Sequence, residues 1–185
     1  MATVLVPLAD GFEDIEAVAV VDILRRGGVE VVTASIRDTL EVRSAHGIVM
    51  KADARLADVA GNAYEAVVLP GGGEGTENLK ASEAVLERLR RQKEDGGFIC
   101  AICAAPTVLV AAGVLDEDQH VTCYPTCQMD LDRPWVNQPV VVHDNVITGQ
   151  APGTALLFGL VVLQMLAGPS VAQKVARGMV TDVLG

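Results

Sequence analysis

The chain has 185 residues, of which 50% are hydrophobic and 21% charged, and its mean hydropathy of +0.36 excludes an intrinsically disordered protein. Its 24 acidic and 14 basic residues give a net charge of −10, which argues against nucleic-acid binding as the main function, because such a chain repels phosphate backbones. The length predicts one domain with a single core over residues 1–185.

The cellular setting is predicted from charge and hydropathy along the chain. The segment Met1–Glu16 contains no Lys or Arg, so it does not have the features of a signal peptide. The longest apolar run, Ala155–Leu163, is shorter than the ~20 residues of a membrane span. We expect a soluble, cytoplasmic protein without a membrane partner, in which the cysteines are reduced.

Aliphatic segments bounded by turn residues predict strands at Thr3–Pro7, Glu30–Ser35, Ile48–Lys51, Ala66–Leu69, Phe98–Ile102, His120–Cys123, Val140–His143 and Val146–Thr148. Helical periodicity and capping signals predict helices at Asp14–Arg26, Ser82–Lys93, Pro106–Ala112, Thr154–Ala167 and Ser170–Met179. The first helix is expected to end at Gly27-Gly28 and to bury one face formed by Ile15, Val18, Ala19 and Ile23.

This alternation of strands and helices predicts an α/β fold, with a doubly wound, mostly parallel sheet and helices on both faces. Ligands of such sheets bind beyond the carboxyl ends of the strands. The chemistry is therefore expected after Pro7, after Leu69 and after Ile102.

Cys103 lies at one of these strand ends, directly before the helix that starts at Pro106. A thiol in that place faces free backbone N–H groups and the positive end of the helix dipole, which favour the thiolate and lower its pKa. The alternative is a small buried thiol that fills space under the helix.

A second strand end is followed by Pro-Gly-Gly-Gly-Glu-Gly, residues 70–75. Gly71, Gly72 and Gly73 can bring backbone N–H groups close to a ligand, as an oxyanion hole requires. A plain tight turn is the alternative, and the segment matches neither a P-loop nor a dinucleotide fingerprint.

The third strand end leads into Gly11–Glu16, which opens the first helix. Glu13 and Asp14 need no role beyond complementing the helix dipole. Glu16 lies on the inner face, where burial would favour the neutral carboxyl group, and this group could donate a hydrogen bond to a thiolate. Helix capping is the alternative for Glu16.

The cysteine spacing also resembles a zinc pattern, with Cys100-x2-Cys103 followed by Cys123-x3-Cys127. Cys100 lies inside a strand, so its Cα is expected about 10 Å from that of Cys103 and on the opposite face. That separation exceeds the ~7 Å that a disulfide tolerates. We therefore expect neither a metal site nor a redox pair of Cys100 with Cys103, and no cofactor motif is present.

The histidines do not suggest a Cys–His mechanism. His46, His120 and His143 are scattered, and Ala104, not a histidine, follows the cysteine. Solvated histidines are expected.

Together, four motifs become characteristic: Gly-Phe-Glu-Asp-Ile-Glu-Ala (11–17), Val-Val-Leu-Pro-Gly-Gly (67–72), Ala-Ile-Cys-Ala-Ala-Pro (101–106) and Ala-Pro-Gly-Thr-Ala (151–155). In this order, and over essentially the whole chain, they resemble the DJ-1/PfpI superfamily, especially its parkinsonism-associated deglycase and bacterial YajL-type branch. The resemblance implies a flavodoxin-like sandwich that is usually a homodimer, with its cysteine on a sharp strand-to-helix nucleophile elbow.

The same resemblance implies the roles of individual residues. Cys103 would be the nucleophile and Glu16 its protonated partner. The backbone amides of Gly72 and Ala104 would form the oxyanion pocket, which Tyr124 and Pro152 would also line.

The chain departs from the eukaryotic branch in two places. Tyr124 replaces a histidine near the thiol, and Gly149-Gln150 replaces a Ser-Arg pair. A mechanism with that histidine as general base does not fit, so the base must be Glu16 or water. Cys123 and Cys127 flank Tyr124 and are expected to pack in the core, with a resolving-thiol role as the alternative.

The leading functional hypothesis is a cysteine-dependent glyoxalase or deglycase with a stress-protective role. It would act on 2-oxoaldehydes such as methylglyoxal, or on their early adducts with thiols and amines, and release lactate. The second is a redox-responsive protective protein or holdase chaperone that uses oxidation of Cys103. A cysteine hydrolase or amidotransferase ranks last, because Ala104 stands where the peptidase branches have histidine.

Overall fold

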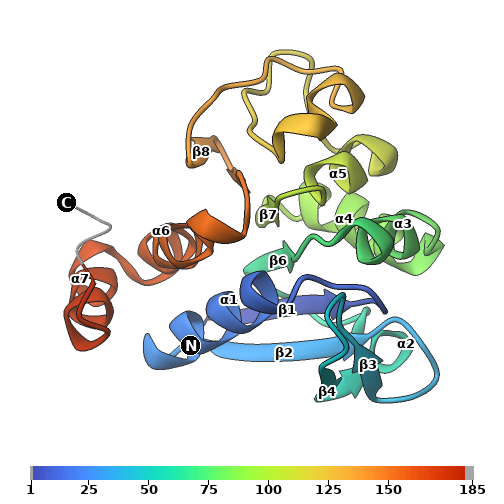
Figure 1. Ribbon diagram of the computed structural model, residues 1–185, viewed down its shortest axis with the longest axis horizontal. Helices are drawn as coiled ribbons and strands as arrows, with labels where there is room; N and C mark the ends of the chain where they lie inside the picture. The colour runs from blue at the N-terminus through green and yellow to red at the C-terminus, as the bar shows by residue number, and fades with distance from the viewer. Residues whose placement is uncertain (1, 182–185) are drawn as a thin grey trace.

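The central element is a seven-stranded sheet, seen in the computed structural model of the chain, which describes residues 2–181 (Figure 1). Its strands follow the order β5-β2-β1-β6-β7-β9-β8, and all neighbours are parallel except β9 and β8. The strands are β1 (Thr3–Leu8), β2 (Glu30–Ser35), β5 (Ala54–Arg55), β6 (Ala66–Leu69), β7 (Phe98–Ile102), β8 (Val140–His143) and β9 (Val146–Gly149).

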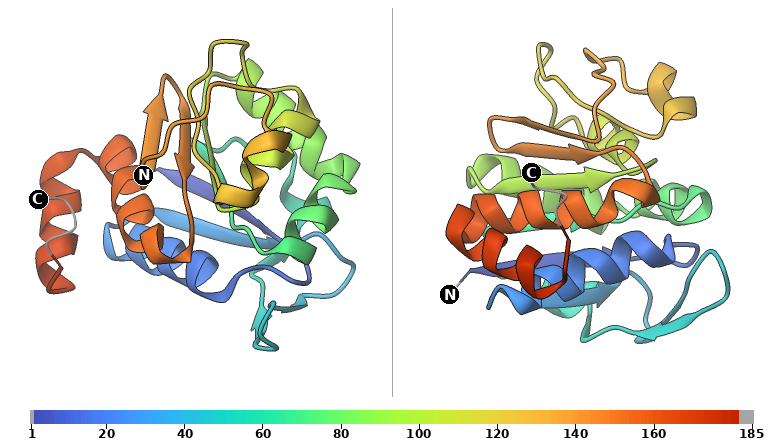
Figure 2. Two further views of the ribbon diagram at one scale, coloured as in Figure 1. Left: turned by 45° about the horizontal axis from the view of Figure 1, so that its top comes forward. Right: turned by 60° about the vertical axis from the view of Figure 1, so that its left-hand side comes forward.

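Helices cover both faces of this sheet (Figures 1 and 2). One face carries α1 (Asp14–Arg26), α6 (Ala155–Ala167) and α7 (Pro169–Gly178). The other carries α2 (Leu56–Val59), α3 (Gly73–Lys80), α4 (Glu83–Glu94) and α5 (Pro106–Ala112). Two 3-10 helices, η1 (Pro125–Asp130) and η2 (Pro152–Thr154), flank β8 and β9 in the chain. The predicted doubly wound α/β fold is confirmed.

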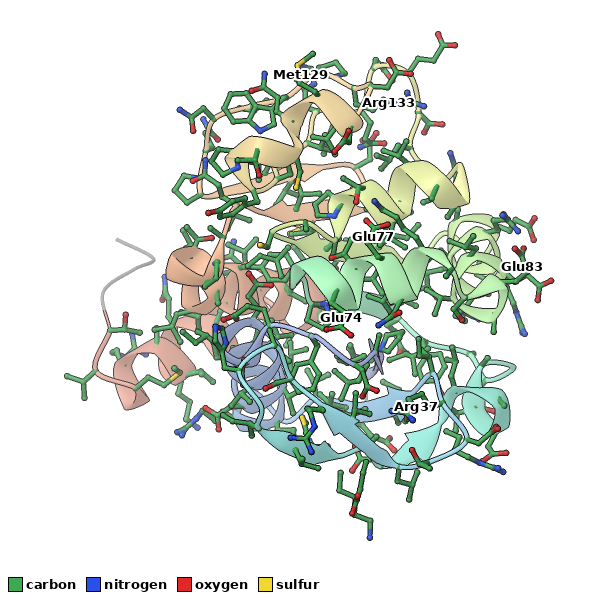
Figure 3. All side chains as sticks on the ribbon, turned by 45° about the vertical axis from the view of Figure 1, so that its right-hand side comes forward. Arg37, Glu74, Glu77, Glu83, Met129 and Arg133 are labelled. Atoms are coloured by element: carbon green, nitrogen blue, oxygen red, sulfur yellow. The ribbon has the colours of Figure 1, made fainter. Side chains whose placement is uncertain are left out.

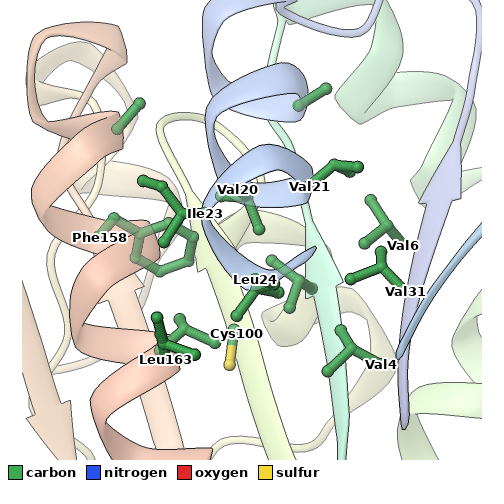
Figure 4. Packing of buried hydrophobic residues seen from close by; sticks show 14 of the residues in the cluster. Val4, Val6, Val20, Val21, Ile23, Leu24, Val31, Cys100, Phe158 and Leu163 are labelled. Atoms are coloured by element: carbon green, nitrogen blue, oxygen red, sulfur yellow. The ribbon is translucent and has the colours of Figure 1, made fainter. Parts of the chain in front are cut away.

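Alternating side chains of the strands supply two apolar clusters, one under each helical layer. Val4 and Val6 of β1 pack under α1 and α6, whereas Leu5 points to the α4 and α5 side. Figure 4 shows the first cluster, in which Phe158 and Leu163 of α6 meet α1. No helix among residues 2–181 is long and apolar enough to cross a membrane.

A two-stranded arm projects from the sheet between β2 and β5 (Figure 2). It consists of β3 (Glu41–Arg43) and β4 (Val49–Lys51), which pair in antiparallel fashion. The predicted strand Ile48–Lys51 therefore belongs to this arm, not to the central sheet. The strands β3 and β5 and the helix α2 are too short for periodicity to reveal.

The predicted strand at His120–Cys123 is wrong. Only Val121 forms a bridge there, with Trp135, and the Thr122 N–H donates to the side chain of Thr148 at 2.9 Å. Both sides of β9 are already occupied, by β7 and by β8, so this segment cannot pair with β9 as a strand.

The predicted buried face of α1 is also partly wrong. Ile15 and Val18 are 57% and 55% exposed, while Glu16, Val20 and Ile23 point into the molecule. The helix has two apolar stripes, and the sheet and α6 bury the one that contains Glu16.

Candidate active site

Cys103 lies on a sharp turn between β7 and α5. Its φ of +65° is a conformation that non-glycine residues rarely adopt, and such strain is concentrated at functional sites. The backbone holds the turn on both sides, because the Cys103 N–H donates to the Gly149 carbonyl at 3.0 Å and its carbonyl accepts from the Tyr124 N–H at 2.8 Å. The side chain is only 8% exposed.

Glu16 is fully buried next to this thiol. Its Oε2 atom accepts the Gly71 N–H at 2.7 Å, and its Oε1 atom is buried without a hydrogen-bond partner of standard geometry. A Cβ atom on Gly71 would lie 2.8 Å from both the Cys103 Cβ and the Glu16 Oε2, so only glycine permits this approach. Because Oε2 accepts a hydrogen bond, a proton on this carboxyl group belongs on Oε1.

Helix capping at the start of α1 is performed by Glu13, not Glu16. The Glu13 side chain accepts the Glu16 N–H at 2.8 Å, and the Glu13 N–H donates to the Gly71 carbonyl at 3.0 Å. The Glu16 side chain is thereby left for the interior, toward which the sequence predicted it to point.

The backbone N–H groups of Gly72 and Ala104 face the Cys103 sulfur. Gly72 has a φ of +93°, and a Cβ atom there would lie 2.2 Å from the Gly11 carbonyl oxygen. The structure divides the predicted segment 70–75, because Pro70, Gly71 and Gly72 precede the helix and Gly73 begins α3. The structure thus brings together Cys103, Glu16, Gly72 and Ala104.

The electrostatics of the pair are dominated by burial. Burial raises the pKa of Glu16 to about 7, although the Gly71 N–H and the Cys103 thiol lower it. Burial, and next the charge of Glu16, raise the pKa of Cys103 to about 12, against the effect of the Ala104 and Gly72 N–H groups. The expected lowering of the thiol pKa is therefore wrong, because burial disfavours the thiolate and, while Glu16 is ionised, a second negative charge would enter the same site.

The other two predicted pocket residues lie at the periphery. Tyr124 is joined to Cys103 through its backbone, and its side chain is exposed. Pro152 begins η2, after the end of β9, and makes no hydrogen bond to the Cys103 turn. Gln150 donates to Asn137 at 2.8 Å, so its neutral amide is already engaged.

The cysteines form no zinc cluster among residues 2–181, and all four are free thiols. Cys100 and Cys103 pack in the same apolar cluster, so the prediction that they face opposite sides is wrong. The positive φ of Cys103 turns its side chain back to the side of Cys100.

Sequence reasoning missed a contact between the arm and α1. His46 lies 2.7 Å from Asp14 through its Nδ1 atom, and Ser44 hydrogen-bonds the other carboxylate oxygen. The Asp14 carboxylate raises the pKa of His46. Glu13, Asp14 and His46 form the only cluster of three or more potential metal ligands found between residues 2 and 181. No local pattern signals the contact, because the two segments are 32 residues apart.

A separate cleft of about 400 Å³ lies between the arm and the start of α3, with Arg37 and Glu74 among its lining residues (Figure 3). Arg37 pairs with Asp10 in this cleft. Its lining includes neither Cys103 nor Glu16.

Comparisons with known proteins place this geometry in one family. The family model of the DJ-1/PfpI family matches residues 2–165. The chain is 39% identical over 178 residues to protein dj-1beta of Drosophila melanogaster, covering 95% of each chain. It is 37% identical over 171 residues to the glutathione-independent glyoxalase DJR-1.2 of Caenorhabditis elegans, covering 91% of this chain and 89% of that one.

A solved structure of oxidized Toxoplasma gondii DJ-1 superposes with a TM-score of 0.94 at 35% identity, over 98% of this chain and 100% of that chain. Both the sequence match and the structural match extend over nearly the full length. The chain belongs to the DJ-1/PfpI family.

Proposed function

We propose that the protein is a cofactor-independent, cysteine-dependent glyoxalase and deglycase. Its substrates would be 2-oxoaldehydes such as methylglyoxal and their early adducts with thiols or amines, and lactate would be released. The observation that supports this proposal most directly is the buried Glu16 carboxyl group, with a pKa of about 7, next to a thiol on a strained turn. The relative that is named a glutathione-independent glyoxalase supports the same reaction class.

The protonation state of the pair supports nucleophilic attack near neutral pH. One proton shared by two buried groups can reside on the thiol or on the carboxyl group, and both arrangements carry the same net charge. The N–H groups of Gly72 and Ala104 face the sulfur and stabilise the arrangement with a thiolate and a protonated Glu16, although burial and the charge of Glu16 outweigh them and raise the pKa of the thiol. In that arrangement Oε1, which has no other partner, donates to the sulfur.

The reaction would begin with addition of the Cys103 thiolate to the aldehyde carbon of methylglyoxal, forming a hemithioacetal whose oxygen takes a proton from Glu16. The Glu16 carboxylate would next remove the hydrogen of that carbon as a proton, and the resulting enediol would be reprotonated at the neighbouring carbon. This isomerisation gives a lactoyl thioester of Cys103. Water would hydrolyse it to lactate and restore the thiol.

The test is lactate formation from methylglyoxal by the fully reduced protein, with wild type compared with Cys103→Ser. Many equivalents of lactate per protein molecule are expected from the wild type and none from the variant. Stoichiometric aldehyde loss without lactate would instead show trapping by a reactive thiol and would overturn the proposal.

A redox-responsive protective role is the second candidate. It is favoured by the surroundings of the sulfur, because the two N–H groups and the Glu16 carboxyl group that face it could also hold the oxygens of a sulfinic acid. One similar solved structure is itself described as oxidized. Mild peroxide should add two oxygens to Cys103 before any other residue, and intact-mass measurement followed by peptide mapping would detect this.

We also propose that the protein is a homodimer. Ile15 and Val18 of α1 are exposed, and so are Val49 of the arm and Ile48 just before it. Ser44 and His46 join the arm to the first turn of α1. Apolar side chains of this size on two adjoining elements mark a surface that a partner covers. A second copy of the chain is the partner that we propose.

A further inference from the structure

Two cysteines outside the proposed active site donate hydrogen bonds to the same carbonyl oxygen. The Cys123 thiol donates to the Tyr124 carbonyl oxygen at 3.2 Å, and the Cys127 N–H donates to the same oxygen at 2.8 Å. Cys123 precedes the cap residue of η1, and Cys127 lies in the first turn of that helix. The Cys123 thiol and the Cys127 backbone therefore meet at one carbonyl oxygen at the start of the helix.

The two thiols differ in their access to solvent. Cys123 is completely buried, whereas Cys127 is half-buried and lies between the exposed residues Thr126 and Gln128. Both sulfurs pack on the apolar cluster beneath α4 and α5, but Cys103 belongs to the cluster on the other face of the sheet. This placement argues against the resolving-thiol role toward Cys103 that the sequence left open.

A buried hydrogen-bond donor near Cys123 has no oxygen or nitrogen acceptor. The indole N–H of Trp135 is buried without a hydrogen-bond partner of standard geometry, although buried indole N–H groups are ordinarily paired. This N–H faces the Cys123 sulfur and stabilises its anionic form. Burial, and then the neighbouring Cys127, raise the pKa of Cys123. Because Cys123 is completely buried and Cys127 only half-buried, Cys127 is the thiol that meets an oxidant first.

We propose that Cys123 and Cys127 form a reversible disulfide, a second redox site of this protein that operates independently of Cys103. The oxidant would be a hydroperoxide. The Cys127 sulfur attacks its outer oxygen, the O–O bond breaks, and Cys127 becomes a sulfenic acid while an alcohol or water leaves. The Cys123 sulfur then attacks the sulfenic sulfur, and water leaves as the S–S bond forms. Two thiols thus give two electrons to one hydroperoxide.

The proposal is tested with Cys103→Ser protein, in which the proposed nucleophile cannot contribute. The protein is treated with a mild excess of hydrogen peroxide, denatured, alkylated and digested with a protease that cleaves before aspartate. Because Asp118 and Asp130 flank the segment, both cysteines fall in the one peptide Asp118–Met129, separate from Cys100. Peptide mapping also distinguishes the disulfide from oxidation of Met129, which is 89% exposed near the end of η1 (Figure 3).

The expected product is a peptide that is lighter by two hydrogen atoms and carries no alkyl group, and dithiothreitol should restore both alkylation sites. In the matched variant Cys127→Ser, Cys123 should remain fully alkylatable after the same treatment. In Cys123→Ser, Cys127 should accumulate as a sulfenic acid that dimedone traps. The proposal is overturned if both cysteines stay alkylatable in Cys103→Ser, or if wild-type protein links Cys103 to either of them.

Discussion

At the scale of single residues, Glu16 is a carboxyl group that folding removes from water at a measurable cost. Its pKa rises from 4.5 to about 7 on folding, so the folded protein holds a proton that the unfolded chain has lost. The contribution of Glu16 to stability is therefore complete below pH 4.5 and decreases as the pH rises to about 7. The difference amounts to about 3 kcal/mol.

The variant Glu16→Gln removes this titration. At pH 8 it should be more stable than the wild type, by about 1–3 kcal/mol in urea unfolding, and the difference should shrink towards pH 5. A constant difference across this range would mean that Glu16 does not carry a raised pKa.

The reactivity of Cys103 should depend on pH through the proton that it shares with Glu16. In the wild type, alkylation of Cys103 by iodoacetamide is expected to rise with a midpoint near pH 7. At that pH the pair of Glu16 and Cys103 loses the first of its two protons, and the remaining proton is shared. In Glu16→Gln no carboxyl proton is shared with the thiol, so the step near pH 7 should disappear and alkylation should rise only at the pH at which the buried thiol itself ionises. An unchanged pH profile in this variant would show that the thiolate forms without Glu16.

Individual site residues could be predicted from the sequence where they belong to a motif. Cys103 and Glu16 could be named because the first follows a strand end, the second lies in the first turn of the helix after another, and both belong to family motifs; the fold brings them together. The contact of His46 with Asp14 could not be foreseen, since it depends on where the arm folds back onto α1.

At the scale of elements, two neighbouring glycines after β6 have different structural roles. Gly72 adopts a positive φ and lies against the backbone of Gly11 and Glu13, whereas nothing lies within 4 Å of a Cβ atom on Gly73. Gly72→Ala should therefore lower the free energy of unfolding by about 2–4 kcal/mol, because both the backbone conformation and the contact are lost.

Gly73→Ala is the matched control, one residue further along the chain. It should leave stability unchanged or raise it by up to about 1 kcal/mol, since alanine favours a helix over glycine. Urea unfolding monitored by circular dichroism compares the two variants. Equal destabilisation by both would refute the assigned role of Gly72.

The elements of the central sheet were predictable because buried parallel strands read as aliphatic runs between helical patterns. Glu30–Ser35, Ala66–Leu69 and Phe98–Ile102 were predicted with the bounds that the structure has. The segment His120–Cys123 has a similar composition, but only Val121 forms a bridge there, with Trp135, and such tertiary pairing is not encoded in local composition.

At the scale of the whole molecule, the exposed stripe of α1 explains why its buried face could not be chosen from periodicity alone. Both stripes are apolar, and we propose that a second copy covers the one with Ile15 and Val18. The double variant Ile15→Lys/Val18→Glu should shift the protein from dimer to monomer in analytical ultracentrifugation, because it would bury charges in the interface.

Met129→Lys serves as the control for this experiment, because Met129 is highly exposed on η1, away from α1. It should leave the association state unchanged. A wild-type protein that sediments as a monomer at all accessible concentrations would contradict the proposed dimer.

The central claim is that Cys103 and Glu16 act as one unit on 2-oxoaldehydes. Its most direct test is the rate of lactate release from methylglyoxal by four reduced proteins: wild type, Cys103→Ser, Glu16→Gln and the double variant. We expect sustained turnover only in the wild type, a loss of at least about a hundredfold in Glu16→Gln, and a double variant no slower than Cys103→Ser alone. Full turnover in Glu16→Gln, or lactate release that survives Cys103→Ser, would contradict the account.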